Sequence, residues 1–397
     1  MITFQEAFQK VLEHSIDLGM EEVPLMKSLG RFLAQDIYAD RDFPPSNRAT
    51  KDGIAIQYSA LVNSGHTYKI EGIAAAGVVQ QVLSDKANCL EVMTGAVVPK
   101  NADTVIMYEH ITIENGSVTI NDIVRKGQNI HYKGTDKKVG SKILSTGSKI
   151  TPAEIGVMAS VGGAKLQVKR NPKICAIATG NELVEVNASP EPHQIRKSNM
   201  LTIKAALLNS SITSSTLHLV DDKKVIGCEL KKAFIENDVL LLSGGVSKGK
   251  YDFIPEVMES LGVEIVFHRV AQRPGKPFWF GIHKQLKTVI FSFPGNPVST
   301  FANYHLYFLP WLYKSWNIPI ENLYIKLNVE LTISASLTRF IQVKSTWVDG
   351  SLWATPVIEN GSGDLTSLAQ ADGFICLEPR EKVYRVGEKV KFVNTRV

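Results

Sequence analysis

Cysteine is scarce in this sequence. Four of the 397 residues are cysteines, and no two of them form a CxxC pair: Cys89, Cys175, Cys228 and Cys376. This wide spacing disfavours a zinc site or a dithiol redox motif. Three of the four lie in apolar, strand-like runs, where cysteine behaves as a small buried apolar residue. We therefore expect a protein of a reducing compartment, the cytoplasm.

Long uncharged apolar runs are missing as well. No stretch approaches the roughly 18 apolar residues that a membrane-spanning helix needs. Residues 1–14 carry Glu6, Lys10 and Glu13 among their apolar side chains, so we expect no signal peptide. The sequence therefore predicts no membrane association.

Charge of one sign is not in large excess. The chain has 44 Lys and Arg against 39 Asp and Glu, a net charge of +5, and no dense basic stripe interleaved with aromatic residues. This pattern disfavours a nucleic-acid partner but permits a small anionic ligand. A hydrophobic content of 44% is ordinary for a globular protein, and the length predicts two to four domains.

Two helices are predicted from capping boxes, in which a Thr precedes a Glu by three residues. The first helix follows Thr3 and is expected to stop at Gly19. The second follows Thr151, has a proline at its first position, and is expected to run to about Val161.

Two stretches are predicted to form β structure. Residues 41–56 are rich in turn formers and predict a long loop, and residues 58–139 then predict a small β domain with a hairpin at Asn115-Gly116. From residue 320 onward the pattern is again all β, with a hairpin at Asp349-Gly350 and a last strand at 389–393. This second stretch predicts a small barrel or sandwich.

The region from 171 to about 318 alternates strands with helices. Short apolar runs predict buried strands at 174–179, 239–242 and 288–293, and helices are predicted at 200–208, 254–261 and 298–309. Such alternation indicates a parallel α/β sheet, which binds ligands at the carboxyl ends of its strands.

A glycine-bearing turn follows each of these strands: Thr-Gly-Asn-Glu at 179–182, Ser-Gly-Gly-Val-Ser at 243–247 and Pro-Gly-Asn-Pro at 294–297. Such turns let backbone N–H groups approach an anion. One of them alone would indicate only a tight turn, but three at one edge of a sheet favour a shared anion site. The turns match neither a GxGxxG fingerprint nor a Walker A loop, which disfavours an ordinary dinucleotide or P-loop enzyme.

Charged residues accompany these turns. The cations are Lys248, Lys250, Arg269, Arg273 and Lys276, and they suit an oxyanion, although a solvated charged face would look the same. The acids are Glu182, Asp221, Asp222 and Asp252. Carboxylates beside phosphates commonly hold Mg²⁺, while Asp221-Asp222 could instead be a simple helix cap.

The chain resembles the molybdopterin molybdenumtransferases, a family that includes the E domain of gephyrin. The resemblance runs through nearly the whole chain in family order. It is carried by Asp-Phe-Pro-Pro at 42–45 through Asp-Gly at 52–53, Met-Thr-Gly-Ala at 93–96, Ala-Asp-Thr-Val at 102–105 through Glu109, Thr-Pro-Ala-Glu-Ile-Gly at 151–156, Thr-Gly-Asn-Glu-Leu-Val at 179–184, Ser-Gly-Gly-Val-Ser at 243–247, Pro-Gly-Lys-Pro at 274–277 and Pro-Gly-Asn-Pro-Val-Ser at 294–299.

This resemblance implies a multi-domain α/β plus β protein. A central three-layer α/β domain of molybdopterin-binding type, with a mostly parallel sheet, is expected at 171–318. An inserted small β domain is expected at 46–139, an N-terminal linking domain at 1–45 and 140–170, and a C-terminal β-barrel domain at 319–397. It also implies an elongated homodimer, with the active site at the dimer interface.

The resemblance further implies a reaction. Molybdate is inserted into adenylylated molybdopterin with release of AMP, Mg²⁺ supports the step, and a molybdopterin adenylyltransferase is the pathway partner. The implied catalytic residues are Asp52, Thr94, Asp136, Glu182, Asp221 and Asp252, of which Glu182, Asp221 and Asp252 would hold the metal. The implied substrate-binding residues are Gly244, Gly245, Ser247, Arg269, Arg273, Lys276, Pro294, Gly295, Asn296, Ser299 and Ser362.

The sequence departs from the family pattern at several of these places. Arg-Ala-Thr-Lys at 48–51 replaces Asn-Ser-Ala-Met, His131 replaces an Arg, and Gln342 stands where the family has Arg. Lys248 and Lys250 are cations where many members are neutral or acidic. These changes concern the handling of molybdate more than that of the pterin nucleotide.

Two rival functions share the fold. The chain could carry out the preceding step, adenylylation of molybdopterin, but the β domain and the barrel would then be unnecessary. It could also be a non-catalytic scaffold, as gephyrin clusters receptors. The absence of a long linker or an extra interaction domain disfavours the scaffold.

Overall fold

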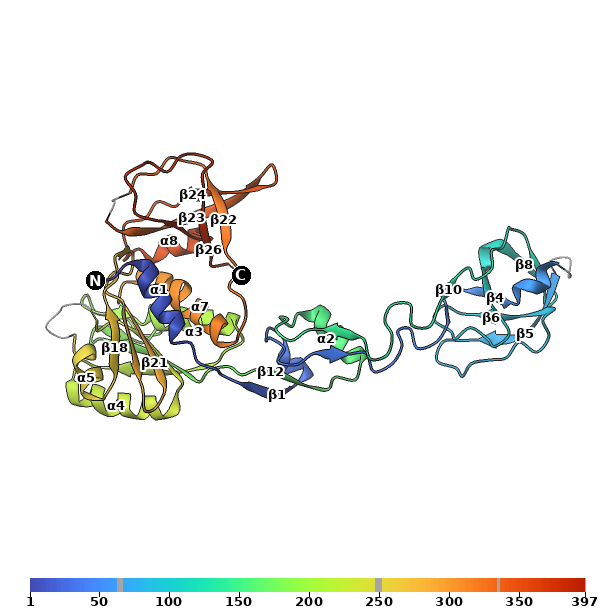
Figure 1. The fold of residues 1–397 in the computed structure, drawn as a ribbon, viewed down its shortest axis with the longest axis horizontal. Helices are drawn as coiled ribbons and strands as arrows, with labels where there is room; N and C mark the ends of the chain where they lie inside the picture. Colours follow the sequence, from blue (N-terminus) through green and yellow to red (C-terminus); the bar gives the residue numbers. More distant parts are fainter. Residues whose placement is uncertain (63–66, 247–251, 334–335, 397) are drawn as a thin grey trace. The chain divides into compact units, whose positions relative to one another are not determined.

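The computed structural model describes residues 1–62, 67–246, 252–333 and 336–396 (Figure 1), which fall into two compact units. The first unit comprises Met1–Val23, Ser28–Ala34 and Gln167–Val397. The second comprises Pro24–Lys27 and Gln35–Leu166. The division into four domains at the expected boundaries stays a prediction.

The elements have the following bounds. The helices are α1 (Phe4–Glu13), α2 (Pro152–Ser160), α3 (Ser198–Asn209), α4 (Lys223–Glu236), α5 (Ile254–Ser260), α6 (Pro297–Asn303), the π-helix η4 (Tyr304–Phe308), α7 (Leu309–Ser315) and α8 (Leu365–Gln370), with 3₁₀ turns η1 (Leu25–Ser28), η2 (Tyr58–Val62) and η3 (Tyr108–His110). The strands up to the α/β region are β1 (Met20–Pro24), β2 (Ile37–Tyr38), β3 (Arg48–Ala49), β4 (Gly53–Ile56), β5 (Thr67–Ala74), β6 (Asn88–Val92), β7 (Thr104–Met107), β8 (Ile111–Glu114), β9 (Ser117–Ile120), β10 (Ile130–His131), β11 (Lys142–Leu144) and β12 (Lys165–Lys169). The remaining strands are β13 (Ile174–Thr179), β14 (Leu183–Val184), β15 (Ile195–Arg196), β16 (Ser214–Leu219), β17 (Val239–Ser243), β18 (Glu264–His268), β19 (Gln272–Arg273), β20 (Trp279–His283), β21 (Thr288–Phe293), β22 (Leu323–Leu327), β23 (Thr338–Val348), β24 (Ser351–Pro356), β25 (Gly373–Leu377) and β26 (Lys389–Asn394).

The centre of the first unit is a six-stranded sheet in the order β16-β13-β17-β21-β20-β18. Its first four strands are parallel, so the three predicted strands do lie side by side in one direction. The other edge is antiparallel, because β20 returns against β21 and β18 pairs with β20. This antiparallel edge was not predicted from the sequence, whereas α4 is the helix expected if Asp221-Asp222 is a helix cap.

Helices cover both faces of this sheet. Successive residues of a strand point to opposite faces, so Ile174 and Ala176 of β13 pack with α1, α3, α6 and α7, whereas Cys175 and Ile177 pack with α4 and α5. Figure 1 shows these helices on the two sides of the sheet. The expected three-layer α/β domain is thereby confirmed.

The C-terminal strands close into a barrel. Their order is β23-β24-β22-β26-β25, and β25 pairs back with β23. The predicted hairpin joins β23 to β24, with Asp349 and Gly350 both at positive φ. The expected barrel is confirmed, and β19 adds to it alongside β23.

The second unit contains a six-stranded sheet in the order β7-β4-β6-β5-β9-β8. The hairpin at Asn115-Gly116 joins β8 to β9, as predicted. The prediction that residues 41–56 form only a loop was wrong, because β4 is a fully buried strand between β6 and β7. Its short apolar run is hidden among turn residues, so pairing with distant strands decides its structure.

Both predicted capping boxes are present, at Thr3 and at Thr151. The helix after Thr151 ends close to the predicted position, but α1 ends at Glu13, well before Gly19. After α1, the chain is held by hydrogen bonds to α7 instead of continuing as a helix. Trp311 Nε1 donates to the His14 carbonyl at 2.9 Å, and the Ile16 N–H donates to Ser315 Oγ at 3.2 Å. Among the described residues, no helix is long and apolar enough to cross a membrane.

Candidate active site

The carboxyl ends of β13, β17 and β21 meet at one edge of the α/β sheet, because these three strands are adjacent and parallel. Each runs directly into one of the predicted turns. The turns line a single cavity of about 830 Å³, a volume typical of small-molecule sites. The predicted binding residues Gly244, Gly245, Pro294, Gly295 and Asn296 all lie in its wall.

The turn after β17 requires glycine. Gly244 and Gly245 have φ of 99° and 71°, a region that residues with a Cβ rarely adopt. A Cβ on Gly244 would lie 2.6 Å from Thr179 Oγ1, and one on Gly245 would lie 2.6 Å from Ile254 Cγ1. The two glycines therefore let the turn pack closely against the neighbouring turn and against α5.

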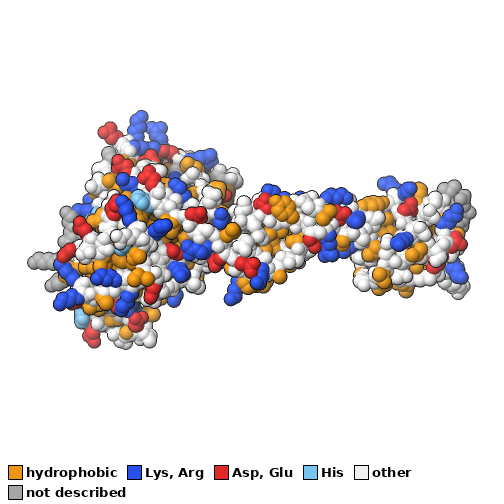
Figure 2. Space-filling model, turned by 60° about the horizontal axis from the view of Figure 1, so that its bottom comes forward, with side chains coloured by type: hydrophobic (Ala, Val, Ile, Leu, Met, Phe, Trp, Pro, Cys, Tyr) orange, Lys and Arg blue, Asp and Glu red, His pale blue; other side chains and the backbone are white. Residues whose placement is uncertain are grey.

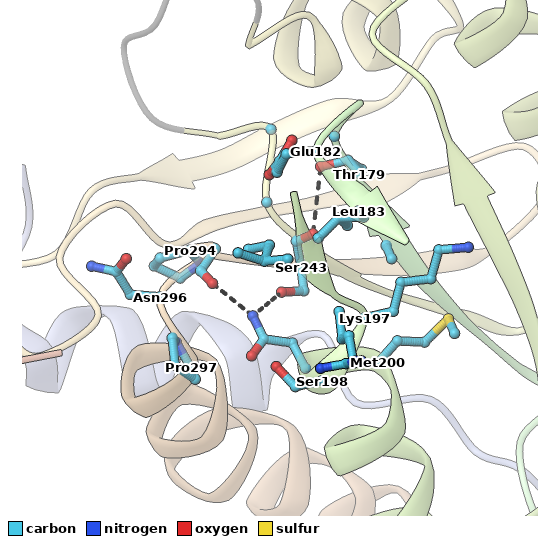
Figure 3. Close-up of a pocket in the computed structure, with 18 of the residues that line it drawn as sticks. Thr179, Glu182, Leu183, Lys197, Ser198, Met200, Ser243, Pro294, Asn296 and Pro297 are labelled. Atoms are coloured by element: carbon cyan, nitrogen blue, oxygen red, sulfur yellow. Dashed lines mark hydrogen bonds between the residues drawn. The ribbon is translucent and has the colours of Figure 1, made fainter. Parts of the chain in front are cut away.

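Asn199, in the first turn of α3, holds two of the turns together. Its Nδ2 donates to the Gly295 carbonyl at 2.6 Å, to Ser243 Oγ at 2.9 Å and to Thr300 Oγ1 at 3.3 Å. Figure 3 shows Ser243 and Pro294 facing each other across these dashed bonds, with Thr179 beside Ser243. Sequence reasoning missed Asn199, because only the folded chain brings α3 between the two turns.

The acids Glu182, Asp221 and Asp252 all line the cavity. Asp221 Oδ2 accepts the Asn181 N–H at 3.2 Å, and Asn181 Oδ1 accepts the Asp221 N–H at 3.0 Å, so these bonds join the loops that follow β13 and β16. Asp222 is different: it caps α4 by accepting from the N–H groups of Lys224 and Val225. The helix-cap interpretation thus holds for Asp222, whereas Asp221 faces the cavity.

A magnesium site made of protein ligands alone is not present in the described part of the chain, where no three acid, His or Cys side chains come close enough to hold a metal ion. Mg²⁺ in phosphoryl-handling sites commonly has one or two carboxylate ligands and takes the rest from substrate phosphates and water. The three carboxylates around this cavity fit that arrangement.

Three of the predicted cations do not line the cavity. Arg269, Arg273 and Lys276 are not among the residues that line the cavity, although Pro277 of the same turn is. Lys197 does line it; only 8% exposed, this side chain lies 2.5 Å from Glu185. On the face in Figure 2, Lys and Arg are interspersed with Asp and Glu rather than gathered into one broad positive surface.

The remaining predicted binding residues, Ser299, Ser362 and Ser247, differ in where they lie. Ser299 is buried inside α6 and does not line the cavity. Ser362, in the C-terminal part of the chain, accepts from Asn296 Nδ2 at 2.8 Å, which ties its loop to the third turn. Ser247 falls outside the described residues, as do Lys248 and Lys250.

In the second unit, strand ends gather another polar set. Because β4 is antiparallel to β6 and β7, Asp52 before β4 lies beside Thr94 after β6 and Tyr108 after β7. Asp52 Oδ1 accepts the Thr94 N–H at 2.6 Å and its Oγ1–H at 2.8 Å, and these bonds lower the pKa of Asp52. Tyr108 donates its phenolic O–H to Glu91 at 2.6 Å. The structure thus pairs two predicted residues, Asp52 and Thr94, and adds Tyr108 and Glu91.

Asp136 has a separate partner in this unit. His131 Nε2 lies 2.9 Å from Asp136 Oδ1. His131 stands on β10, which pairs with β3 so that His131 lies opposite Arg48. The departure from the family pattern at position 131 therefore touches a predicted catalytic acid directly.

These features define a class: a three-layer α/β domain with a pocket at its parallel strand ends, followed by a barrel and accompanied by a separate β unit. Three family models match the chain in this order. They are described as "MoeA N-terminal region (domain I and II)" over residues 2–162, "Probable molybdopterin binding domain" over 175–314 and "MoeA C-terminal region (domain IV)" over 324–394.

Known relatives match over the full length. A molybdopterin molybdenumtransferase of Synechocystis sp. is 39% identical, with 99% of each chain covered, and one of Bacillus subtilis is 31% identical, covering 100% of this chain and 94% of the relative. A solved molybdopterin biosynthesis MoeA protein of Pyrococcus horikoshii superposes with a TM-score of 0.82 at 30% identity, covering 99% of both chains. The chain belongs to the MoeA family of molybdopterin molybdenumtransferases.

Proposed function

We propose that this protein inserts molybdenum from molybdate into adenylylated molybdopterin and releases AMP, which completes the molybdenum cofactor. The observation that carries the proposal is the cavity at the three strand ends, in a chain 39% identical over its whole length to a relative named for this reaction. A cavity of this size, walled by glycine turns and carboxylates, suits a phosphorylated pterin nucleotide.

The turns bind and orient the substrate in this proposal. Backbone N–H groups near Gly245 and Gly295 donate to phosphate oxygens, and the bonds made by Asn199 hold two turns at a fixed separation. Glu182, Asp221 and Asp252 hold Mg²⁺ together with the substrate phosphates. When bound, Mg²⁺ neutralises phosphate charge and favours cleavage of the adenylate bond.

Two adjacent acids offer a matched test. Asp221→Asn removes a carboxylate that faces the cavity but keeps an acceptor for the Asn181 N–H. Asp222→Asn makes the same chemical change one residue later, and asparagine remains a good helix cap. With adenylylated molybdopterin, molybdate and Mg²⁺, we expect molybdate-dependent AMP release to fall at least about tenfold in Asp221→Asn. Losing a group that stabilises charge raises the barrier by about 1.4 kcal/mol or more, and about 1.4 kcal/mol is a factor of ten in rate.

Asp222→Asn should keep the wild-type rate, and both variants should melt near the wild-type temperature. Equal rates in the wild type and Asp221→Asn would contradict the assigned role of Asp221. A wild-type protein that forms no cofactor under these conditions would contradict the proposed function itself.

The rival enzymatic function is the preceding adenylylation. The full-length match to molybdenumtransferases, including the N-terminal region and the C-terminal barrel, favours insertion. Incubation with molybdopterin and ATP without molybdate separates the two functions. We expect no adenylylated product from this protein alone.

We also propose that the protein acts in the cytoplasm as a homodimer, in which Asp52 and Thr94 of one protomer serve the cavity of the other. The family resemblance supports this arrangement. The test mixes two inactive variants, Asp52→Ala and Asp221→Asn, under conditions that allow subunits to exchange. Mixed dimers should regain activity, because each then has one cavity with a complete set of residues; a mixture that stays inactive would contradict the proposal.

A further inference from the structure

The neighbouring strand β16 holds both backbone polar groups of Gly180, the first residue after β13. The two strands are parallel, with Ala178 opposite His218. The Gly180 N–H donates to the Leu219 carbonyl at 3.1 Å, which extends this pairing one residue past the end of β13. The His218 side chain adds a second bond, since its Nε2 lies 2.8 Å from the Gly180 carbonyl oxygen. A carbonyl oxygen only accepts, so Nε2 carries the hydrogen and donates it.

The backbone of Gly180 decides where the carboxylate of Glu182 lies. Gly180 has a φ of 133°, and a Cβ at this position would lie 2.6 Å from Glu182 Oε1 and closer still to Oε2. The carboxylate therefore lies against the Gly180 α-carbon, in a space that exists because this residue is glycine. Glu182 lines the cavity (Figure 3), and within the described residues its carboxylate has no hydrogen-bond or salt-bridge partner. Its position therefore follows the position of Gly180.

A second link runs in the opposite direction, from the first turn to the loop after β16. Asp221 accepts the N–H of Asn181, which stands between Gly180 and Glu182, and Asn181 accepts the Asp221 N–H in return. Thus β16 holds the first turn through His218, and the first turn holds the loop after β16 through Asn181. Neither His218 nor Asn181 lines the cavity. Both therefore act on a ligand in the cavity only through the acids that they hold.

A charged pair near His218 offers another role for this residue. Lys197 Nζ donates to Glu185 Oε1, and this bond is the main cause of the lowered pKa of Glu185, to which the charge of His218 adds a smaller contribution. The two roles make different demands on His218. The bond to Gly180 needs an N–H donor at the position of Nε2 and no charge, whereas an effect on Glu185 needs a positive charge.

We propose that His218 is a positioning residue that places the Glu182 carboxylate in the cavity, by fixing the Gly180 carbonyl with its Nε2–H. The proposal rests on the proposed function, in which Glu182 helps to hold Mg²⁺ together with the substrate phosphates. A carboxylate that is already in place favours binding, because less freedom is lost when the ligand arrives. His218 should therefore set the affinity of the cavity for a divalent cation without touching that cation.

Two amide variants of His218 test the bond. The side-chain amide of Gln extends about as far from the backbone as histidine Nε2, whereas the amide of Asn ends at the level of Nδ1. His218→Gln therefore keeps the donor and removes the charge, and His218→Asn removes both. The probe is Mn²⁺ titrated into the full chain saturated with AMP, with free Mn²⁺ measured by electron paramagnetic resonance. We expect about tenfold weaker Mn²⁺ binding in His218→Asn, as is typical when a group that orients a metal ligand is lost, and wild-type binding in His218→Gln.

Glu185→Gln is the control for the charged pair, and this variant should bind Mn²⁺ like the wild type. Weaker binding in both His218→Gln and Glu185→Gln would assign His218 to the charged pair and overturn the proposal. Unchanged binding in His218→Asn would overturn it as well. So would a wild type that binds no Mn²⁺, because no cation would then depend on Glu182.

A double-mutant cycle separates positioning from a general loss of stability. Glu182→Gln should weaken Mn²⁺ binding at least as much as His218→Asn. The variant with both changes should bind no more weakly than Glu182→Gln alone, because His218 acts through Glu182. Additive losses would show that His218 acts elsewhere and would overturn the proposal.

Cofactor formation from adenylylated molybdopterin, molybdate and Mg²⁺, measured on the same proteins, keeps the two proposals apart. If the wild type forms cofactor while His218→Asn binds Mn²⁺ normally, the proposed function stands and only the positioning role fails. A wild type that forms no cofactor contradicts the proposed function itself, and with it the inference that rests on it.

Discussion

The cavity of the first unit and the polar set of the second unit are built in different ways. Around the cavity, three of the lining segments are turns of consecutive residues such as 243–245, whose glycines dictate the local backbone. The set around Asp52 has no such signature. Its members come from the ends of three antiparallel strands, and each takes its place from pairing with distant strands.

Because the two sites are built differently, we expect them to respond differently to amino-acid substitutions. A turn can be damaged by altering its own residues or the one side chain that ties it to its neighbour. A set gathered by strand pairing depends first on the sheet, so a backbone clash far from any polar atom would disperse it. The following changes, from the largest expected effect to the smallest, test this contrast.

The largest effect is expected from Gly53→Ala in β4. A Cβ at this position would lie 1.8 Å from the Ile106 carbonyl oxygen, a contact that only movement of β7 could relieve. We expect a loss of about 3 kcal/mol or more in the stability of the second unit, measured by urea denaturation. Gly140→Ala is the control: its φ is also positive, but a Cβ there would meet nothing within 4 Å, so only about 1 kcal/mol should be lost. Equal losses would show that the sheet does not depend on the close approach at Gly53.

A smaller loss is expected from Asn199→Ala, which removes the bonds from Nδ2 to two turns. We expect a loss of about 1–2 kcal/mol in stability and a raised KM for the pterin substrate, because the turns lose their fixed separation. Asn209→Ala, at the exposed far end of α3, is the control and should leave the KM unchanged. A wild-type KM in Asn199→Ala would mean that the turns hold their positions by backbone geometry alone.

Tyr108→Phe should lower the free energy of unfolding by about 1 kcal/mol, because it removes one hydrogen bond of 2.6 Å to Glu91 and leaves the ring in place. Burial and Glu91 together raise the pKa of the Tyr108 phenol, so the O–H stays protonated throughout the neutral range. Chemical denaturation at neutral pH measures the loss, and a variant as stable as the wild type would show that strand pairing alone places this part of the set.

The smallest effect is expected from Thr94→Val, which leaves Asp52 with only the backbone N–H of residue 94. The pKa of Asp52, lowered in the wild type, should rise toward its ordinary value. A lowered carboxyl pKa stabilises the fold above the ordinary pKa, and this stabilisation is lost as the pH falls through the lowered value. The advantage of the wild type should therefore be present at pH 7 and fade on acidification.

NMR titration of the Asp52 carboxyl carbon measures this shift directly. Thr94→Ser keeps the hydroxyl donor and should titrate like the wild type. Identical midpoints in the wild type and Thr94→Val would show that the Thr94 hydroxyl does not act on Asp52.

The same contrast explains what could be predicted from the sequence. The glycine turns, the two hairpins and both capping boxes are signals within a few residues, and all are present in the structure. The burial of β4 and the bonds of Asn199 arise from contacts between residues far apart in the chain. The bond from His218 to the Gly180 carbonyl is of the same kind, since no local pattern indicates which strands become neighbours.

The most direct test of the account is the position of the phosphates in a crystal structure of the protein with adenylylated molybdopterin. The account predicts phosphate oxygens within hydrogen-bonding distance of backbone N–H groups at Gly245 and Gly295, with Asp221 facing the pyrophosphate. A nucleotide bound away from these turns, with the cavity filled only by water, would contradict it.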